Sequence, residues 1–373
     1  MLNWIAKLGV IGLTLDETPT IVSAAGIAKV RFLDEVQTIN RYVAELRARG
    51  VEAIVVSLHE GASAGPDING CSNPTGPAFD IATAIDDAVD VVLTGHHHNG
   101  YVCEVDGKLV TQALSNGRLI TDIDLSIDRR TGDVVAKSAE NVVVTRGVQP
   151  DPKAQQLVDR YAGLALPIAN VPIGRITEDL LKAQEPLVGN LRGESPLGNL
   201  IADAQLAATD DEAGAVAAFM NPGGVREDLL HASSAAREGD GVVTYGEAFG
   251  VQPFNNLLTT MDLTGEQLYA LLGQQFTVRR VLAPSGTVQY TVASDGSGVV
   301  PGSLAIGGTP VDLGATYRIT VNSFLAGGGD GFTVLTQGTN VVNQPGFDVD
   351  ALEAYLSGDP VSAPATDRIG VAG

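Results

Sequence analysis

The chain has 373 residues, which is long enough for two domains, and its 44% hydrophobic content is that of a compact globular protein. The formal net charge of −21 repels nucleic acid and anionic lipid, so we expect no nucleic-acid partner and expect local cations wherever an anion binds. The sequence contains no run of about twenty apolar residues, so we expect no membrane span.

The first 149 residues alternate predicted strands and helices. The run KLGVIGLTL predicts a strand, and FLDEVQTINRYVAELRARG predicts a helix, because its apolar residues recur every three or four positions before a glycine. The next elements are a strand in VEAIVVSL, a helix in DIATAIDDA and a strand in VDVVLTG. KLVTQAL and LITDIDLSID are expected to be antiparallel strands joined by turns. This order predicts a layered α/β domain.

A different pattern begins near residue 150. Asp151 as N-cap and Pro152 at the first helical position predict a connecting helix over 150–169. A second α/β unit is expected over 170–373. In it, SPLGNLIADAQLAA predicts a helix, VAAFMNPGGVR a strand entering a glycine turn, and YRITVNSFLAGGGDGF a strand entering a glycine-rich loop.

The chain has two cysteines, Cys71 and Cys103, in polar, Gly- and Pro-rich surroundings that indicate loops. An even pair in loops suits a disulfide in an oxidising compartment, and two unrelated free thiols are the alternative. Lys7 interrupts the early run MLNWIAKLGVIGLTL and no small-residue cleavage site follows it. We therefore predict no signal peptide in this sequence.

Four of the five histidines follow two of the predicted buried strands. His59 follows VEAIVVSL, and His96, His97 and His98 follow VDVVLTG. Groups just past the carboxyl ends of strands in an open α/β sheet gather on one edge. In an extended segment, His96 and His98 would point to one side and His97 to the other. Because neutral imidazole is the commonest metal ligand, His59, His96 and His98 are a candidate metal set, and the alternative is hydrogen-bonded histidines at a polar strand end.

Six sequence blocks carry a family resemblance. IVVSLHEG and LTGHHHNG resemble the last two metal-ligand blocks of the calcineurin-like metallophosphoesterases. ESPLGNLIADA, NPGGVR, VTYGEAFGVQPFNN and VNSFLAGGGDGF resemble, in order, blocks of the C-terminal domain of 5′-nucleotidases. The resemblance covers nearly the whole chain. It implies an incomplete α/β/β/α metallophosphoesterase domain over 1–149, a connecting helix over 150–169, and a separate α/β nucleoside-binding domain over 170–373.

The resemblance also identifies what the sequence lacks. The family's dimetal site needs an Asp-x-His block, a bridging aspartate and an Asn-His block, and neither Asp-x-His nor Asn-His occurs here. We therefore expect a chain without the family's N-terminal portion and without its catalytic acid/base pair. By resemblance, His59 and His96 share one divalent ion and His98 serves a second. Zinc, manganese and iron all suit such ligands.

The residues that the resemblance assigns to the nucleoside are all present. Phe254 and Phe324 would stack on the base, Asn221 and Asp330 would bond base or ribose, Arg192 and Arg226 would reach ribose or phosphate, and Asn256 falls at a family contact. Glycine turns allow close backbone approach, guanidinium forks bind anions, and aromatic rings stack on bases. The alternatives are a core position for either phenylalanine and a turn-capping role for Asp330.

The sequence predicts a metal-dependent phosphoester hydrolase that acts on a nucleotide in an extracellular, periplasmic or cell-envelope location. Because the bridging carboxylate is missing, we expect this chain alone to hydrolyse nucleotides negligibly. One alternative is a non-catalytic nucleotide-binding module or gene remnant. Another is a hydrolase of cyclic nucleotides or nucleotide sugars, and the pocket residues do not choose among these substrates. The sequence does not indicate an oligomeric state.

Overall fold

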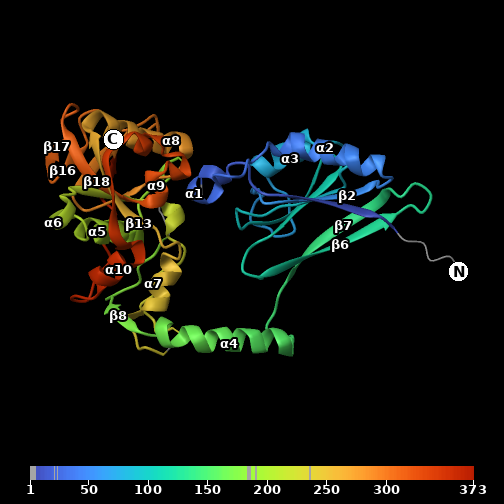
Figure 1. Cartoon of the computed structure of the whole chain (residues 1–373), viewed down its shortest axis with the longest axis horizontal. Helices are drawn as coiled ribbons and strands as arrows, with labels where there is room; N and C mark the ends of the chain where they lie inside the picture. Colours follow the sequence, from blue (N-terminus) through green and yellow to red (C-terminus); the bar gives the residue numbers. More distant parts are fainter. Residues whose placement is uncertain (1–5, 21, 23, 183–185, 190, 235–236) are drawn as a thin grey trace. The chain divides into compact units, whose positions relative to one another are not determined.

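The chain is a mixed α/β protein that divides into two compact units (Figure 1). The computed structural model describes residues 6–20, 22, 24–182, 186–189, 191–234 and 237–373. One unit comprises Met1–Pro19 with Gly26–Asp151, and the other comprises Thr20–Ala25 with Pro152–Gly373. The first five residues of the early apolar run lie outside the described residues. Elsewhere, no described helix is both long enough and apolar enough to cross a membrane.

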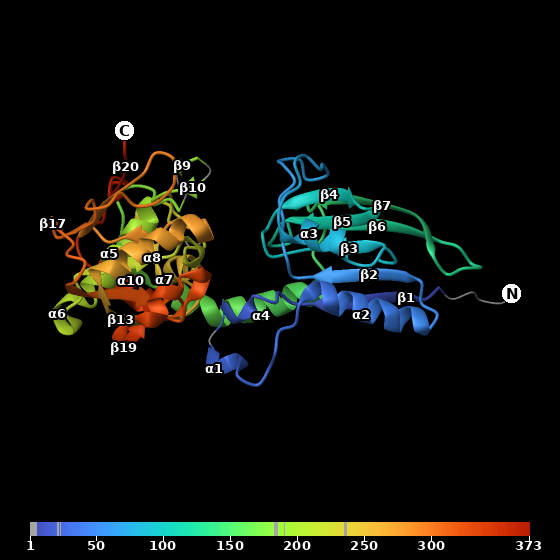
Figure 2. The ribbon, with the colours of Figure 1, turned by 90° about the horizontal axis from the view of Figure 1, so that it is seen from above.

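The first unit is built on a five-stranded sheet in the order β1-β2-β3-β5-β4. Its strands are β1 (Leu8–Leu13), β2 (Ala53–Leu58), β3 (Val91–Leu93), β4 (Gly100–Val105) and β5 (Lys108–Ala113). All neighbours pair in parallel except β4, which is antiparallel to β5. The helices α2 (Glu35–Ala48) and α3 (Pro77–Ala84) cover one face, and the ribbon of β6 (Leu119–Ile127) and β7 (Val134–Val143) lies on the other (Figures 1 and 2).

Local sequence explains why these elements form. Asp34 caps α2 by accepting the backbone N–H of Gln37 at 2.7 Å, and Ile39 and Val43 face the core one helical turn apart. Strand β2 is buried at every position except Ser57, as expected for a strand covered on both faces. A short 3-10 turn, η1 (Thr18–Thr20), and a short helix, α1 (Ala24–Ile27), precede α2.

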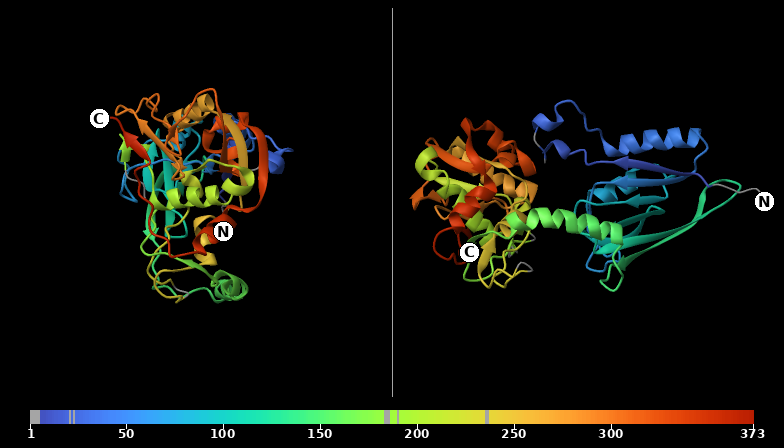
Figure 3. Two further views of the ribbon diagram at one scale, coloured as in Figure 1. Left: turned by 90° about the vertical axis from the view of Figure 1, so that its left-hand side faces the viewer. Right: turned by 60° about the horizontal axis from the view of Figure 1, so that its bottom comes forward.

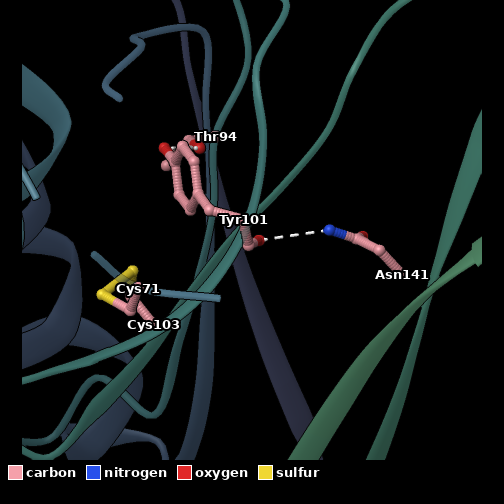
Figure 4. The surroundings of a disulfide bond; sticks show 5 residues. All are labelled: Cys71, Thr94, Tyr101, Cys103 and Asn141. Carbon is pink, nitrogen blue, oxygen red and sulfur yellow. Dashed lines mark hydrogen bonds between the residues drawn. A yellow bond between two sulfur atoms is a disulfide. The ribbon is translucent and has the colours of Figure 1, made fainter. Parts of the chain in front are cut away.

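Asn141 attaches the β6–β7 ribbon to the sheet. It is buried in β7, and its side-chain amide donates to the carbonyl oxygens of Ile68 at 2.7 Å, Gln112 at 2.9 Å and Tyr101 at 3.3 Å (Figure 4). These carbonyls belong to a loop, to β5 and to β4. One buried amide therefore joins three segments to the ribbon, and each bond satisfies a group that is withdrawn from water.

The predicted disulfide between Cys71 and Cys103 is confirmed, with a Cα–Cα distance of 5.1 Å (Figure 4). One detail of the prediction was wrong, because Cys103 lies within β4 and is buried, whereas Cys71 lies in a loop as expected. The bond therefore fixes the loop after β2 to the outermost strand of the sheet.

Two other local expectations are corrected. KLVTQAL and LITDIDLSID form β5 and β6, but β5 pairs with β3 and β4, and β6 pairs with β7 in a separate two-stranded ribbon. Helix α3 starts earlier than expected, with Pro77 in its first turn, and it ends at Ala84 because Ile85 is extended. For β5, pairing with the distant strand β3 outweighs the local pattern.

The second unit contains a five-stranded sheet in the order β14-β11-β18-β13-β19. Its strands are β11 (Ala217–Met220), β13 (Leu257–Thr264), β14 (Ala283–Pro284), β18 (Thr316–Asn322) and β19 (Thr339–Phe347). The helices are α4 (Pro152–Ala169), α5 (Pro196–Ala207), α6 (Asp210–Ala213), α7 (Tyr245–Val251), α8 (Gly265–Val278), α9 (Ser323–Ala326) and α10 (Asp348–Leu356). Helix α4, the green helix in Figure 3, begins at Pro152 as predicted. None of its residues is buried.

Smaller strands and turns complete this unit. They are β8 (Pro172–Arg175), β9 (Pro186–Val188), β10 (Leu191–Arg192), β12 (Val242–Thr244), β15 (Val288–Val292), β16 (Ala305–Ile306), β17 (Thr309–Pro310) and β20 (Ile369–Val371), with the 3-10 turns η2 (Pro222–Gly224), η3 (Gly329–Gly331) and η4 (Thr333–Gln337). The two largest apolar clusters of this unit fill most of its interior. One lies around Phe219, Leu271 and Phe332, and the other around Leu200 and Leu352.

The pairing of β11 with β18 brings together two loops predicted to bind a ligand. The two strands are parallel, with Phe219 opposite Val321. Their carboxyl ends therefore lie side by side, and the turn after Met220 adjoins the loop after Asn322. In an open α/β sheet, this edge is where ligands bind.

The disulfide should stabilise the first unit. Replacing Cys71 and Cys103 by serine removes a crosslink that closes a loop of about thirty residues, so we expect the free energy of unfolding to fall by about 3–4 kcal/mol in urea titrations. Thiol titration of the unfolded, unreduced protein provides the check on the bond. Two reactive thiols would contradict it.

Candidate functional site

The histidines that follow β2 and β3 lie close together. The ring centroids of His59 and His96 are 5.3 Å apart in an edge-to-face arrangement with an interplanar angle of 67°. The rings of His96 and His97 are also 5.3 Å apart. The parallel pairing of β2 with β3 produces this cluster, because it places both strand ends at the same edge of the sheet.

The predicted extended conformation of the segment from His96 to His98 is wrong. His96 has φ 63° and His98 has φ 55°, both in the left-handed region, and the N–H of His97 donates to the carbonyl oxygen of Gly95 at 2.7 Å. A tight turn replaces the extended segment, so the expected alternation of side chains does not apply. Non-glycine residues adopt this conformation uncommonly, and histidine is one of the types enriched in it.

Two glycines allow the histidine-bearing loops to approach each other. The N–H of Gly95 donates to the carbonyl oxygen of Glu60 at 3.0 Å. A Cβ added to Gly61 would lie 2.6 Å from the Cβ of His97 and 2.7 Å from the carbonyl oxygen of Gly95. His97 thus packs directly on the backbone of Gly61.

Polar groups missed in the sequence lie near the histidine cluster. Glu60 is buried, and burial raises the pKa of its carboxyl, although a hydrogen bond from the N–H of Gly61 partly opposes the shift. The hydroxyls of Tyr101 and Thr94 are 2.6 Å apart, and burial raises the pKa of Tyr101 to about 12. The position of Glu60 in the block LHEG was the available signal. Nothing local marked Thr94 or Tyr101.

The described residues do not assemble a complete metal site. Among them, no group of three or more His, Cys, Asp or Glu side chains is placed so that it could hold a metal ion. His59 and His96 form a close pair of imidazoles, and His98 occupies the turn beside them. Two imidazoles amount to part of the four-ligand or larger shell that zinc and similar ions require.

A chain of hydrogen bonds in the second unit links the predicted residues Asn221 and Asp330 with Asn322, the last residue of β18. The side-chain amide of Asn322 donates to Oδ1 of Asn221 at 2.9 Å, and the amide of Asn221 donates to Oδ2 of Asp330 at 2.8 Å. Asn221 and Asn322 are buried. Asp330 has φ 57°, so the left-handed backbone of its turn directs the carboxylate back toward the β11 loop. The structure thus brings the predicted residues Asn221 and Asp330 together.

Arg226 and Phe254 form a second predicted pair. The guanidinium carbon of Arg226 lies 5.6 Å from the centroid of the Phe254 ring, and its Nη1 donates to the carbonyl oxygen of Gly223 at 3.2 Å. The Phe254 residue is 54% exposed, so its ring retains a face for a ligand. The backbone N–H of Arg226 donates to the carbonyl oxygen of Val251 at 2.9 Å, which holds the two loops together.

Phe324 is half-buried and partly serves the core, as the alternative interpretation allowed. It packs against the apolar cluster around Phe332, and a Cβ on Gly329 would lie 2.6 Å from its ring. Its neighbour Ser323 accepts the N–H of Leu257 at 3.2 Å. This bond connects the loop of Phe324 to the turn of Phe254.

The two remaining predicted residues differ in their placement. The side-chain amide of Asn256 donates to Oδ2 of Asp348 at 3.1 Å, and Arg192 lies exposed at the end of β10. The sequence did not single out Arg280, whose Nη1 lies 3.5 Å from Oδ1 of Asp330. The signal available was the pair of adjacent arginines after α8, but only the fold shows that one of them reaches the carboxylate.

Comparisons with known proteins place the chain among the 5′-nucleotidases. Residues 172–337 match the family described as 5′-nucleotidase, C-terminal domain. The crystal structure of a 5′-nucleotidase precursor from Thermus thermophilus superposes with a TM-score of 0.77 at 30% identity, and the match covers 98% of this chain and 72% of that one.

Two curated relatives are larger than this chain. Endonuclease YhcR of Bacillus subtilis is 34% identical over 85% of this chain and 24% of its own length. The cell wall protein Lmo0130 of Listeria monocytogenes is 32% identical over 94% of this chain and 46% of its own length. The chain therefore spans a quarter to a half of these relatives.

The contact between Gly61 and His97 leads to a test of the histidine cluster. Gly61→Ala should force His97 to move, because the added methyl group overlaps its side chain, and should lower the free energy of unfolding by about 1–3 kcal/mol. The histidine side-chain NMR signals should shift with it. Gly12→Ala is the control, since no atom lies within 4 Å of its added Cβ. Unchanged stability and unchanged histidine signals in Gly61→Ala would overturn this packing.

Proposed function

Because the chain belongs to the 5′-nucleotidase family of phosphoric ester hydrolases, we propose that its second unit recognises the nucleoside part of a nucleotide and that the whole protein hydrolyses a phosphoester of that nucleotide. The observation that carries the proposal is the joining of Asn221 to Asp330 beside Arg226 and the exposed ring of Phe254. These groups supply hydrogen-bond acceptors, a cation and a stacking surface at one edge of the sheet.

Each group matches a part of a nucleoside monophosphate. The free face of Phe254 suits a flat base, and Phe324 lies on a loop bonded to the same turn. The carboxylate of Asp330 has about four acceptor positions, so contacts with Asn221 and Arg280 leave positions for ribose hydroxyls. Arg226 and Arg280 supply positive charge in a strongly acidic protein, as an anionic ligand requires.

Metal ions belong to the chemistry of this family. A bound divalent ion would polarise the phosphate and lower the pKa of a water molecule. We propose that His59 and His96 contribute to such a site, with His98 beside them, because the first two rings already lie together. The described residues alone supply an incomplete ligand shell. We therefore propose that the described part of the chain hydrolyses nucleotides negligibly on its own.

We also propose that the protein works outside the cytosol. The Cys71–Cys103 disulfide requires an oxidising environment, and one relative is named as a cell wall protein. The second candidate function, a nucleoside-binding module without catalysis, is favoured by the incomplete metal shell. Binding and turnover measured on the same preparation separate the two functions. The absence of nucleic-acid binding stays a prediction.

The nucleoside site can be tested by calorimetric titration with adenosine. We expect a dissociation constant in the micromolar to millimolar range, because stacking and a few hydrogen bonds act without a phosphate clamp. Phe254→Ala and Phe324→Ala should each weaken binding by about 1–3 kcal/mol. His96→Ala, and Phe249→Ala as an exposed aromatic control, should leave it unchanged. An absence of heat at millimolar adenosine would contradict the site.

Hydrolysis is tested separately with AMP. Phosphate release by the full chain in the presence of manganese or zinc should not exceed that of a His59→Ala, His96→Ala double variant, because the described residues of neither protein form a complete metal shell. Turnover well above the double variant would show that the described histidines complete a working site. The binding result would then still decide which unit recognises the substrate.

A further inference from the structure

The turn that carries Phe254 depends on its backbone for the position of the ring. It joins α7 to β13, and Asn255 within it has φ 51°, in the left-handed region. The ring of Phe254 is largely exposed, so core packing does little to hold it. The contacts of Asn256, two residues after Phe254, therefore matter for where the ring lies.

Asp348 bonds to both the main chain and the side chain of Asn256. It is the first residue of α10 and is 1% exposed. Its N–H donates to the carbonyl oxygen of Asn256 at 2.7 Å, and its Oδ2 accepts the side-chain amide of Asn256 at 3.1 Å. Its Oδ1 accepts the N–H of Val349 at 3.0 Å. Both carboxylate oxygens are therefore engaged, and Asp348 is the only residue to which hydrogen bonds anchor Asn256 in the described part of the chain.

No cation compensates the buried charge of Asp348 in the described part of the chain. The elements packed against α10 are α5, α7, β8 and β19, and β19 has no charged residue. The charged residues of α10 and the other three elements are Asp350, Glu353, Asp203, Glu247 and Arg175. Asp203 pairs with Arg368, and Arg175 donates to the carbonyl oxygen of Asp240.

A contribution to the stability of the fold does not explain why an aspartate occupies position 348. Burial raises the pKa of Asp348 to about 6, which means that the fold favours its protonated form. Ionisation of Asp348 at neutral pH therefore lowers the stability of the fold relative to a neutral side chain. Destabilising features of this kind occur where structure serves recognition or catalysis.

We propose that Asp348 is a positioning residue for nucleoside recognition, whose carboxylate holds Asn256 and thereby fixes the turn that presents Phe254 to the base. The inference rests on the proposed function, because the base is the proposed ligand of Phe254. Asp348 acts through Asn256 and does not itself reach the exposed face of the ring. The loss of either acceptor oxygen would release the side chain of Asn256 or the N–H of Val349.

Asp348→Asn tests the inference, with Asp350→Asn as the matched control. The new side chain would place an amide N–H where the carboxylate accepts a bond, so adenosine affinity at pH 7.5 should fall by roughly tenfold, the cost of about one hydrogen bond to a charged group. The melting temperature should change little, because removal of a buried charge offsets the loss of the hydrogen bond. Asp350 accepts the N–H of Phe347 on the same helical turn, and its replacement should leave affinity unchanged.

A parallel fall of melting temperature and affinity in Asp348→Asn would indicate a merely structural role and overturn the inference.

The pH profile gives a second result that a structural role would not produce. The wild-type affinity for adenosine should weaken on acidification through about pH 6, because protonation removes an acceptor from Asp348. The Asp348→Asn profile should be flat over the same range. Equal profiles for the two proteins would overturn the inference.

Hydrogen exchange distinguishes failure of this inference from failure of the proposed function. At pH 7.5 without ligand, the amides of Leu257 and residue 348 should exchange several-fold faster in Asp348→Asn than in the wild type and Asp350→Asn. This measurement does not depend on adenosine binding. Unchanged exchange would show that Asp348 does not hold the turn. If exchange is faster in Asp348→Asn but the wild-type protein binds no adenosine, adenosine is rejected as the ligand. The anchoring of the turn by Asp348 would then still stand.

Discussion

The parallel pairing of β11 with β18 is the constraint on which the polar site of the second unit depends. It places Asn221 and Asn322 at neighbouring strand ends, where neither side chain can reach water. Buried amides must find partners, so Asn322 donates to Asn221, and Asn221 turns its own amide toward Asp330. Asn322 also accepts the N–H of Leu325 and so begins α9, the helix that carries Phe324. A single strand pairing thus sets the relative placement of two loops that lie about a hundred residues apart in the sequence.

The two units hold their loops together by different means. In the first unit, glycines remove side chains where backbones and rings must meet, as Gly61 does beneath His97. In the second, hydrogen bonds of polar side chains join the loops, as those of Ser323 and Asp348 do for the turn of Phe254. The first arrangement is sensitive to added volume, and the second is sensitive to the loss of a donor or acceptor.

Much of the fold followed from local sequence pattern, and the failures have a common cause. The capped helix α5 and the strands β11 and β18 were predicted because periodicity and glycine turns are local signals. The family blocks identified Asn221 and Asp330, which the fold brings together. The left-handed turn at His96, the place of Cys103 in a strand and the contacts of Arg280 were not predicted. Each involves a contact with a segment far away in the chain. His97 packs on Gly61, Cys103 bonds to Cys71, and Arg280 reaches Asp330.

The disulfide has a practical consequence for the production of the protein. Cys71 follows closely on Ile68 and Asn69, the loop residues that exchange hydrogen bonds with Asn141. Recombinant protein made in a reducing bacterial cytosol would lack the crosslink, and this loop would be held by hydrogen bonds alone, whereas export to the periplasm would supply it. Both cysteines lie in the first unit. The choice of expression host therefore decides whether the histidine-bearing unit carries its disulfide. The second unit has no cysteine and is not affected in this way.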